Sequence, residues 1–577
     1  MRTKKGITIV VEVCLSGLLA ASAALSQVTP DRLKAIGDNM KQLKAVGQQL
    51  PETYRKALSG GAQNAIHLAN VWDEVGPRLG RALSQGGGAR KKFSNSATPN
   101  VSTTTVEVSD PSNDFAFSVQ TGFTQSETST AWCGSHVAVG FNDSGSIPES
   151  IFFGPGGVSV NGVALSTDQG KSFQDLGFLN PGSNPNILFE GDPVLGCADA
   201  NTFYYAALSI DFSVPVSAVS VSKSTDGGLT YGDPVEAVSK DFFTHLLDKD
   251  WMTVDPTNPS RLFVTYTDFD SSGLSVCGFI APGVPNPRAA IELVRSTDGG
   301  STWTPPVVLD EVCGFVPAVQ GSQVTVGPGG EVYVAWEHFA DFFTRDLRIR
   351  KSTDNGLTFA SSVKVDDVAF VGDGFELQGG FRDSLDLGSL VVDRSGKATN
   401  GNVYVVWQDG RNLQVPDFDS GLYGYADVLV RGSSDGGSTW SLPVRVNNNP
   451  DPVPGGGGTD QYQPGAAVDK TGKIGVCWYD RRLDPLNYKI DRFCGVSTNA
   501  GLSFANSRQS SPSWEPIHGN DALGDPRYMG DYDGVASDFT QATTGFIGAF
   551  QIMNTRGGVS GNTTLQPNPD VLAVGFR

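Results

Sequence analysis

Acidic residues are the side chains in this 577-residue chain with the clearest capacity for chemistry. A polar residue, a carboxylate in all but one case, stands at the start of each of seven predicted strands: Glu127, Asp192, Asp250, Gln323, Asp386, Asp460 and Asp531. A ring of such carboxylates could bind a divalent cation or act as general acid and base. Hydrogen bonding between neighbouring parts of the fold is an equally good explanation. As candidate catalytic residues we select Asp192, Asp250, Asp531 and the adjacent Tyr532; acid–base chemistry requires no cofactor, and a divalent cation stays an open alternative.

Arginines form the second group of candidates. The pattern W-x-D-x-R occurs twice, at Trp407–Arg411 and at Trp478–Arg482, and two more arginines lie near the candidate acids. Arginines that converge on one site bind a carboxylate ligand through paired hydrogen bonds. The candidate substrate-binding residues are therefore Arg411, Arg482, Arg382 and Arg527. For any one of them, pairing with a neighbouring aspartate is the simpler explanation.

The elements that must position these residues repeat along the chain. Strand-like stretches with alternating apolar residues recur at Val137–Asp143, Phe203–Ser209, Leu262–Asp268, Val332–His338, Val403–Asp409, Ile474–Asp480 and Phe546–Ile552. Their spacing is nearly constant, at roughly 60 to 70 residues, which leaves room for several strands in each interval. The pattern predicts an all-β fold, a seven-bladed β-propeller. Six blades are the alternative.

A short motif recurs between these strands. The pattern Ser-x-Asp-x-Gly-x-Ser/Thr-aromatic is centred on Asp168, Asp226, Asp298, Asp354 and Asp435, and a sixth copy has Asn499 in the aspartate position. In each copy the carboxylate can accept hydrogen bonds from its own turn, and the glycine can take a positive φ. The motif resembles the Asp-box, or BNR repeat, of sialidases and related β-propellers. The resemblance implies a propeller over roughly residues 101–577, in which these aspartates are structural.

The resemblance does not extend to the catalytic motif of sialidases. In that family an arginine triad binds the substrate carboxylate, a Tyr–Glu pair supplies the nucleophile, and an Asp is the acid/base. The first arginine lies in a Phe/Tyr-Arg-Ile-Pro motif, whereas the corresponding stretch here is Gln125–Thr128. Sialidases also have six blades. Tyr532, Tyr528 and Tyr462 are available as nucleophiles, but no motif selects among them.

The N-terminal residues and the composition predict an exported protein. Residues 1–27 carry a basic start, an apolar run and an Ala-Ser-Ala cleavage site, as a secretory signal does. No later segment is apolar and long enough to span a bilayer. The net charge of −19 disfavours nucleic acid as a partner. We expect a secreted or periplasmic protein whose partner is a carbohydrate or glycoconjugate.

Six cysteines remain after the signal. An even number in an exported chain favours disulfides. The candidate pairs are Cys477 with Cys494, Cys277 with Cys313, and Cys133 with Cys197. Buried free thiols are the alternative.

The segment 28–84 has helical periodicity rather than strand periodicity. Thr29-Pro30-Asp31 is a helix start signal, and apolar residues recur at helical spacing to Leu50. A second helix follows Pro51, and Gly60-Gly61 is expected to interrupt it. This hairpin is a packing appendage, a pro-segment or a means of self-association. Residues 85–100 are predicted to be a linker with Arg90-Lys91-Lys92 as an optional processing site, and Thr103–Val108 to supply the outer strand of the last blade.

Three classes of function remain. The chain is a sialidase-like glycoside hydrolase, a non-catalytic glycan- or protein-binding propeller, or a scaffold assembled through its N-terminal helices. Two carboxylates in a pocket with arginines and a tyrosine would favour the first class. Exposed apolar residues on the helix that ends near Leu50 would favour the third. The best single prediction is a carbohydrate-directed role, with hydrolysis undecided.

Overall fold

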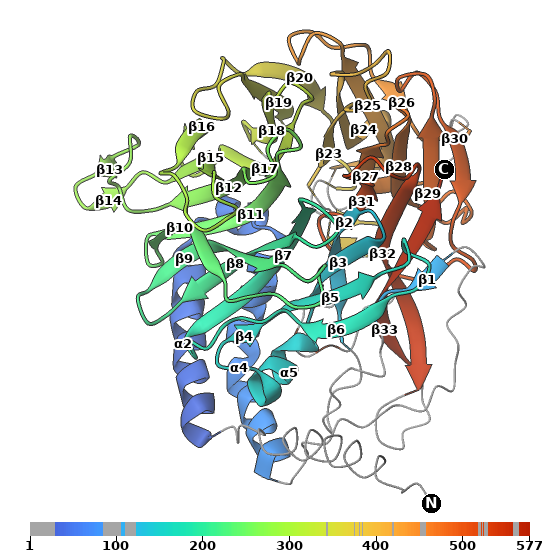
Figure 1. Cartoon of the computed structure of the whole chain (residues 1–577). Helices are drawn as coiled ribbons and strands as arrows, with labels where there is room; N and C mark the ends of the chain where they lie inside the picture. Colours follow the sequence, from blue (N-terminus) through green and yellow to red (C-terminus); the bar gives the residue numbers. More distant parts are fainter. Residues whose placement is uncertain are drawn as a thin grey trace, which may run out of the picture.

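The computed structural model describes residues 29–84, 105–109, 123–341, 344–373, 376–379, 381–382, 385–417, 421–450, 457–516, 521, 523, 529–557 and 565–577. In this part of the chain, antiparallel four-stranded sheets follow one another around a ring (Figure 1). The innermost strand of each sheet contacts the innermost strands of its two neighbours. This is the seven-bladed propeller that the repeat predicted, and the six-bladed alternative is wrong.

The first four blades follow chain order from the inner strand to the outer strand. Blade 1 is β2 (Gln125–Cys133), β3 (His136–Asp143), β5 (Asn161–Ser166) and β6 (Gln174–Phe178); blade 2 is β7 (Ile187–Cys197), β8 (Phe203–Asp211), β9 (Val216–Ser224) and β10 (Val235–Asp241). Blade 3 is β11 (His245–Val254), β12 (Leu262–Asp270), β15 (Arg288–Ser296) and β16 (Val307–Cys313); blade 4 is β17 (Ala318–Val326), β18 (Val332–Phe339), β19 (Arg345–Ser352) and β20 (Val363–Val368). The short β4 (Val158–Ser159) adds to β7 in parallel.

The remaining blades complete the ring. Blade 5 is β23 (Leu387–Val392), β24 (Val403–Asp417), β25 (Gly421–Ser433) and β26 (Val444–Arg445); blade 6 is β27 (Gln461–Val468), β28 (Ile474–Asp480), β29 (Asp491–Ser497) and β30 (Ala505–Arg508). Blade 7 is β31 (Val535–Ser537), β32 (Phe546–Gly557), β33 (Leu565–Phe576) and β1 (Thr105–Glu107). Two small hairpins lie outside the blades, β13 (Phe279–Ala281) with β14 (Val284–Pro285) and β21 (Glu376–Leu377) with β22 (Phe381–Arg382).

The ring is closed by a strand from the N-terminal side of the propeller. β1 pairs antiparallel with β33 and is the outer strand of blade 7, as predicted (Figure 1). Of the predicted stretch, Thr103 and Thr104 lie outside the described residues. Pairing of the two ends of the domain removes a free sheet edge.

Each Asp-box forms the turn between the third and fourth strands of blades 1 to 6. In blade 3, Asp298 Oδ1 accepts hydrogen bonds from the Ser301 and Thr302 backbone N–H groups at 3.1 and 2.9 Å, and Oδ2 accepts one from the Thr302 hydroxyl at 2.6 Å. Gly300 has φ of 86°. These bonds hold the pKa of Asp298 at about 2. The boxes are structural turns, at the opposite end of the strands from the candidate acids.

The N-terminal helices pack against the propeller. α2 (Pro30–Gln49) begins with Thr29 as N-cap, and α4 (Gly60–Ser84) lies beside it (Figure 1). The short α3 (Glu52–Ala57) joins them, so the predicted interruption near Gly60-Gly61 is confirmed. Figure 1 also shows α5 (Ser146–Phe153), which the sequence analysis missed.

The apolar faces of these helices are covered. Ile36, Met40 and Leu43 of α2 form one cluster with side chains of α4, α5 and blades 1 and 2, and Tyr54 and Leu58 join the core of blade 3. Because these residues are at most 2% exposed, the apolar face of α2 is not available for self-association. None of the described helices is long and apolar enough to cross a membrane.

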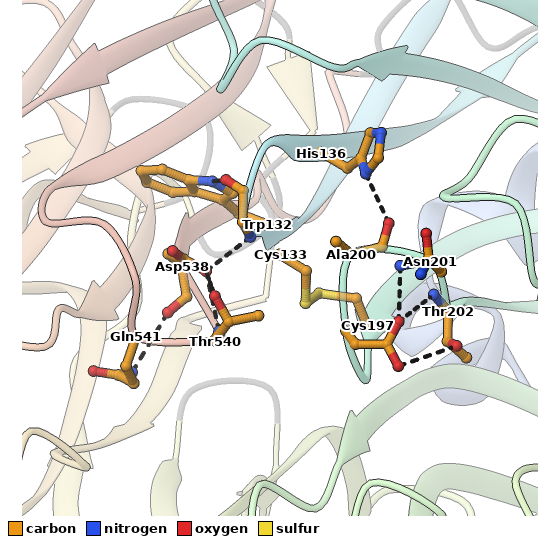
Figure 2. Close-up of a disulfide and its surroundings, with 12 residues drawn as sticks. Trp132, Cys133, His136, Cys197, Ala200, Asn201, Thr202, Asp538, Thr540 and Gln541 are labelled. Carbon is orange, nitrogen blue, oxygen red and sulfur yellow. Dashed lines mark hydrogen bonds between the residues drawn. A yellow bond between two sulfur atoms is a disulfide. The ribbon is translucent and has the colours of Figure 1, made fainter.

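The three predicted disulfides are present in the described residues. Cys133–Cys197 joins the ends of β2 and β7, and so links blades 1 and 2 (Figure 2). Beside it, His136 Nδ1 lies 2.7 Å from the Ala200 carbonyl oxygen, a second contact between the two blades. Cys277–Cys313 ties a loop to β16, and Cys477–Cys494 joins β28 to β29. Disulfides of this number are typical of an oxidising compartment.

Candidate active site

The inner strands carry β-bulges where the candidate acids lie. The pairing shifts between Ser126 and Ser129 in β2, between Gly191 and Val194 in β7, and between Asp248 and Trp251 in β11. Within these bulges three non-glycine residues have positive φ: Glu127 at 50°, Asp192 at 54° and Lys249 at 49°. Such conformations cost energy and are concentrated at functional sites. The bulges turn these side chains away from the regular alternation of the strand.

Six buried carboxyl groups of blades 1, 2, 3 and 7 form what we call the central acid cluster: Glu127, Glu190, Asp192, Asp248, Asp250 and Asp531. Each is at most 3% exposed. Asn142 bridges two of them, because its Nδ2 donates to Glu127 Oε2 at 2.6 Å and its Oδ1 accepts from the Asp192 backbone N–H at 3.0 Å. The Asp531 backbone N–H donates to Glu127 Oε1 at 2.9 Å. Residues far apart in sequence thus meet at one place.

The start of α4 lies on this cluster. The Gly60 backbone N–H donates to Asp531 Oδ2 at 2.7 Å, and that of Gly61 donates to Asp192 Oδ1 at 2.9 Å. Ser59 donates to Asp248 twice, through its N–H at 2.8 Å and its hydroxyl at 2.6 Å. Carboxylates are favourable at a helix N-terminus, because the first N–H groups have no partner within the helix. Three acids of the cluster therefore cap one helix.

The other acids have fewer partners. Both side-chain oxygens of Asp250 and of Glu190, and Asp192 Oδ2, are buried without a hydrogen-bond partner among the described residues. Lys249 Nζ likewise has no hydrogen-bond partner there and lies 3.6 Å from the centre of the Tyr532 ring. Buried polar atoms normally have partners, so a group of them at one place needs an explanation.

Burial raises the pKa of these acids. Burial is the largest cause of the raised pKa of Glu127, Glu190, Asp192 and Asp250, and repulsion by neighbouring acids adds to it. Burial also raises the pKa of Asp248 to about 7. Lys249 opposes the shift for Glu127, Asp192 and Asp250. Carboxyl groups that hold a proton near neutral pH can act as general acids.

The candidate catalytic residues chosen from the sequence lie together. Tyr532 donates its hydroxyl to the Pro193 carbonyl at 2.9 Å, and its ring lies against Trp251. Neighbouring Glu127, Asp192 and Asp250 all contribute to the raised pKa of Tyr532, after burial as the largest cause. Of the other tyrosines considered, Tyr462 contacts Met529, and Tyr528 lies outside the described residues.

On the far side of the ring, the polar residues at the strand starts have hydrogen-bond or ion-pair partners. Gln323 bonds the backbone of blade 5 at Gly388 and Leu390, and Asp386 pairs with Arg345 at 2.5 Å. Asp460 accepts from the Ala426 N–H, the Tyr423 hydroxyl and Asn487 Nδ2. These three members of the predicted ring hold neighbouring strands and loops together. The alternative explanation is therefore correct for this half of the ring.

Two of the arginine candidates, Arg411 and Arg482, are paired with acids outside the central acid cluster. Arg411 is held by Asp409 and Asp366, and Arg482 by Asp480 and Asn448. In both W-x-D-x-R stretches the tryptophan N–H also donates to the same aspartate. Each motif therefore forms a local clamp, as the simpler explanation requires, and substrate binding by Arg411 and Arg482 stays a prediction. Arg382 lies in β22, with its side chain outside the described part, and Arg527 lies outside the described residues.

Three members of the site were not singled out from the sequence. Asp248 and Lys249 precede the candidate Asp250, and Glu190 precedes the candidate Asp192 by two positions. The bulges explain the omission, since strict alternation would have directed these side chains elsewhere. The cluster Asp248-Lys249-Asp250 inside an apolar strand was the available signal. Among the described residues, no group of three or more His, Cys, Asp or Glu side chains is arranged to hold a metal ion.

No protein-family model and no curated protein matches this sequence. Solved structures do match in fold. A Hadza microbial sialidase is 13% identical with a TM-score of 0.38, over 67% of this chain and 65% of the sialidase, which is less than two thirds of its length. An α-L-arabinofuranosidase of Fusarium graminearum is 12% identical with a TM-score of 0.40, over 65% and 92% of the two chains. A protein of unknown function from Dyadobacter fermentans is 11% identical with a TM-score of 0.38, over 83% and 100%. The chain thus has structural similarity, at low identity, to sialidases and arabinofuranosidases.

Proposed function

We propose that this chain is an exported glycoside hydrolase whose acid and base belong to the central acid cluster. The observation that carries the proposal is a group of buried carboxyl groups, Glu190 and Asp250 above all, that have no hydrogen-bond partner in the described part of the chain and lie near Tyr532. Hydrolysis of a glycoside needs one carboxyl group that holds a proton and one that does not. Buried acids with raised pKa values beside acids that accept hydrogen bonds as carboxylates are the arrangement that supplies both.

The electrostatics favour a neutral glycoside over a sialoside. The cluster brings six acids together, and in the described part of the chain Lys249 lowers the pKa of three of them, Glu127, Asp192 and Asp250. Arg411 and Arg482 are already paired. A substrate carboxylate would therefore be repelled, whereas sugar hydroxyls are good hydrogen-bond donors to carboxylates. The predicted signal and the disulfides support export.

A non-catalytic propeller that binds glycans is the second candidate. One observation favours it, namely that α4 covers the acids and leaves little space between the helix and blade 1. The cavity lined there by Asn64, Asn142 and Leu523 has a volume of about 20 Å³. That is enough for about one water molecule, not for a sugar.

The test is hydrolysis of a panel of fluorogenic glycosides by the chain from residue 28 onward. The panel contains neutral arabinofuranosides, galactosides and glucosides, and a sialoside. We expect turnover of a neutral glycoside, and a decrease of kcat by about 10² or more in Asp250→Asn.

The matched control is Asp386→Asn, which changes an acid of the same ring that is paired with Arg345. Asp386→Asn should have the wild-type kcat when kcat is calculated per folded molecule. Equal kcat per folded molecule in Asp250→Asn and wild type would reject this cluster as the source of the acid and base. Turnover of the sialoside alone would reject the preference for neutral substrates.

A further inference from the structure

The contact between α4 and the acids is too close for any side chain. A Cβ added to Gly61 would lie 2.2 Å from Asp192 Oδ1 and 3.0 Å from the Asp192 backbone nitrogen. On the other side, a Cβ at Gly191 would lie 3.0 Å from the Gly61 Cα atom. Two glycines thus allow backbone to lie directly on backbone at the acid cluster. Glycine is the residue that permits such an approach.

The hydrogen bonds at this contact resemble those that a sugar would make. Four donors, the three N–H groups of Ser59–Gly61 and the Ser59 hydroxyl, reach Asp192, Asp248 and Asp531 from one side. Gln320 Nε2 adds a fifth donor to Asp248 at 2.6 Å. A ring of sugar hydroxyls presents donors at a similar density, so the same acids can accept from either.

The cluster contains more acid than the helix end requires. Asp192, Asp248 and Asp531 satisfy the donors of the turn, while Asp250, Glu190 and Asp192 Oδ2 are buried beside them without hydrogen-bond partners in the described residues. A helix N-terminus carries only about half an elementary positive charge. A site made solely to seat a helix would gain nothing from the additional buried acids, which cost free energy. The additional acids indicate a second ligand.

We propose that the Ser59–Gly61 turn occupies a hydroxyl-binding subsite formed by Asp192, Asp248 and Asp531, and that the helical segment Pro30–Ser84 is a plug that must shift before a glycoside can bind. The inference rests on the proposed function, since the ligand that replaces the turn is its substrate. It adds the regulation of that site and makes Asp248 a substrate-positioning residue.

The rest of the segment holds the plug in place. Arg32 donates to the Gly156 carbonyl at 2.6 Å, and Tyr54 donates to the Gly314 carbonyl at 3.2 Å. The apolar residues of α2 and α4 pack on blades 1 and 2. Because this packing does not involve the acids, the turn can be disturbed without removing the segment.

The experiment measures exposure of the acids directly, independently of turnover. Folded full-length protein is treated with a carbodiimide and an amine, and modification of Asp192 and Asp248 is measured by mass spectrometry. Gly61→Ala should increase their modification about tenfold, because the added methyl group excludes the closed position. The control is Gly80→Ala on the same helix, where the added Cβ meets only the end of Leu33 at 3.3 Å. It should leave the modification unchanged.

Asp386 serves as an internal control for unfolding, because it is buried in the same ring away from the plug. If the modification of Asp386 also rises in Gly61→Ala, Ser59→Ala is measured instead. This substitution removes the hydroxyl bond to Asp248 and the weaker bond that the hydroxyl accepts from the Ala62 N–H at 3.4 Å. Asp248 should then become more reactive. Unchanged modification of Asp192 and Asp248 in the folded variants would overturn the plug.

Turnover separates the two proposals. Greater exposure together with faster hydrolysis of a neutral glycoside supports both. Greater exposure without hydrolysis of any panel member supports the plug and rejects the hydrolase. Hydrolysis at the same rate in wild type, Gly61→Ala and Gly80→Ala, with unchanged exposure, supports the hydrolase and overturns the plug.

Discussion

At the residue scale, the buried acids differ in what they are bonded to. Lys240 and Arg288 surround Asp268 and Glu292 in blade 3 with ion pairs of 2.6 to 3.1 Å, so that cluster is compensated. Asp250 has no such partner among the residues that the structure describes. Burial would raise the pKa of Asp268, but its hydrogen bond with His245 and the charge of Lys240 outweigh burial and lower that pKa, whereas burial raises the pKa of Asp250. A contribution to stability therefore does not explain why the unpaired acids are present.

The first prediction concerns stability as a function of pH. Because the folded pKa of Asp250 is raised, the folded state binds more protons than the unfolded chain. Its contribution to stability is present below the ordinary pKa of about 4 and is lost as pH rises through the raised value. Asp250→Asn should therefore raise the free energy of unfolding at pH 8 by about 1 kcal/mol or more, with little effect at pH 4.

Denaturant unfolding of both proteins at several pH values measures this. Asp268→Asn is the matched control, and it should be destabilising at pH 8, because the partners of Asp268 hold its pKa below the ordinary value and its charge contributes stability above that value. A loss of stability in Asp250→Asn at pH 8 would mean that the acid has a partner that stabilises its charge.

At the scale of elements, the Asp-box turns were predictable because every contact in them is local. In blade 3, Asp298 bonds Ser296 two positions before it and Thr302 four positions after it, so the motif carries the whole hydrogen-bond pattern. The same is true of the start of α2, where Thr29 accepts from Arg32. The blade strands were predictable from their alternation and period for a related reason.

The site was only partly predictable, because its contacts are not local. Gly60 and Asp531 are separated by 471 positions in sequence, and neither stretch carries a pattern that predicts their contact. The predicted ring of strand starts was sufficient to bring Asp192 and Asp250 together. The β-bulges that add Glu190 and Asp248 could not be predicted from the sequence. Likewise, W-x-D-x-R placed an arginine near an aspartate, but the sequence did not show that the two are paired in the folded protein.

The second prediction concerns the sixth turn, in blade 6. Asn499 accepts from the Ser503 N–H at 3.1 Å and from the Ser497 hydroxyl at 2.9 Å, as the aspartates do in the other turns. Asn499→Asp should strengthen these bonds by adding charge. We expect a small gain in stability near neutral pH, no more than about 0.5 kcal/mol, because the turn is exposed to water.

The gain should disappear as pH falls from about 4 toward 2, because the new carboxylate would have a lowered pKa like that of Asp298. Thermal unfolding at pH 7 and pH 3 tests this, with Asp298→Asn as the reverse substitution. Loss of stability at pH 7 in Asn499→Asp would show that the Asn499 Nδ2 bond to the Ser503 hydroxyl is the more important one.

At the scale of the whole molecule, the plug and the ring closure lie in adjacent parts of the chain but act separately. The plug ends at Ser84 and the closing strand begins at Thr105. β1 contacts blade 7 on the outside of the ring, whereas the Ser59–Gly61 turn contacts its centre. Displacing the turn therefore need not open the propeller, and weakening the closure need not expose the acids.

The third prediction tests that independence through Ser109. Its hydroxyl accepts from the Val571 backbone N–H at 3.0 Å, and the neighbouring Val108 N–H donates to the Val571 carbonyl at 3.0 Å. Ser109→Ala leaves the buried Val571 N–H without this acceptor, at a cost of about 1–3 kcal/mol. The exposed Ser361→Ala is the control and should cost almost nothing.

Melting temperature and carbodiimide modification are measured on the same samples. Since closure acts at the outer edge of blade 7, Ser109→Ala should lower the melting temperature while the reactivity of Asp192 and Asp248 below the transition stays as in wild type. Gly61→Ala should have the opposite effects: the reactivity of Asp192 and Asp248 increases, and the melting temperature changes little. If Ser109→Ala exposes the acids as much as Gly61→Ala does, the closing strand and the plug open as one unit, and the contacts of blade 7 must transmit that opening to the centre of the ring.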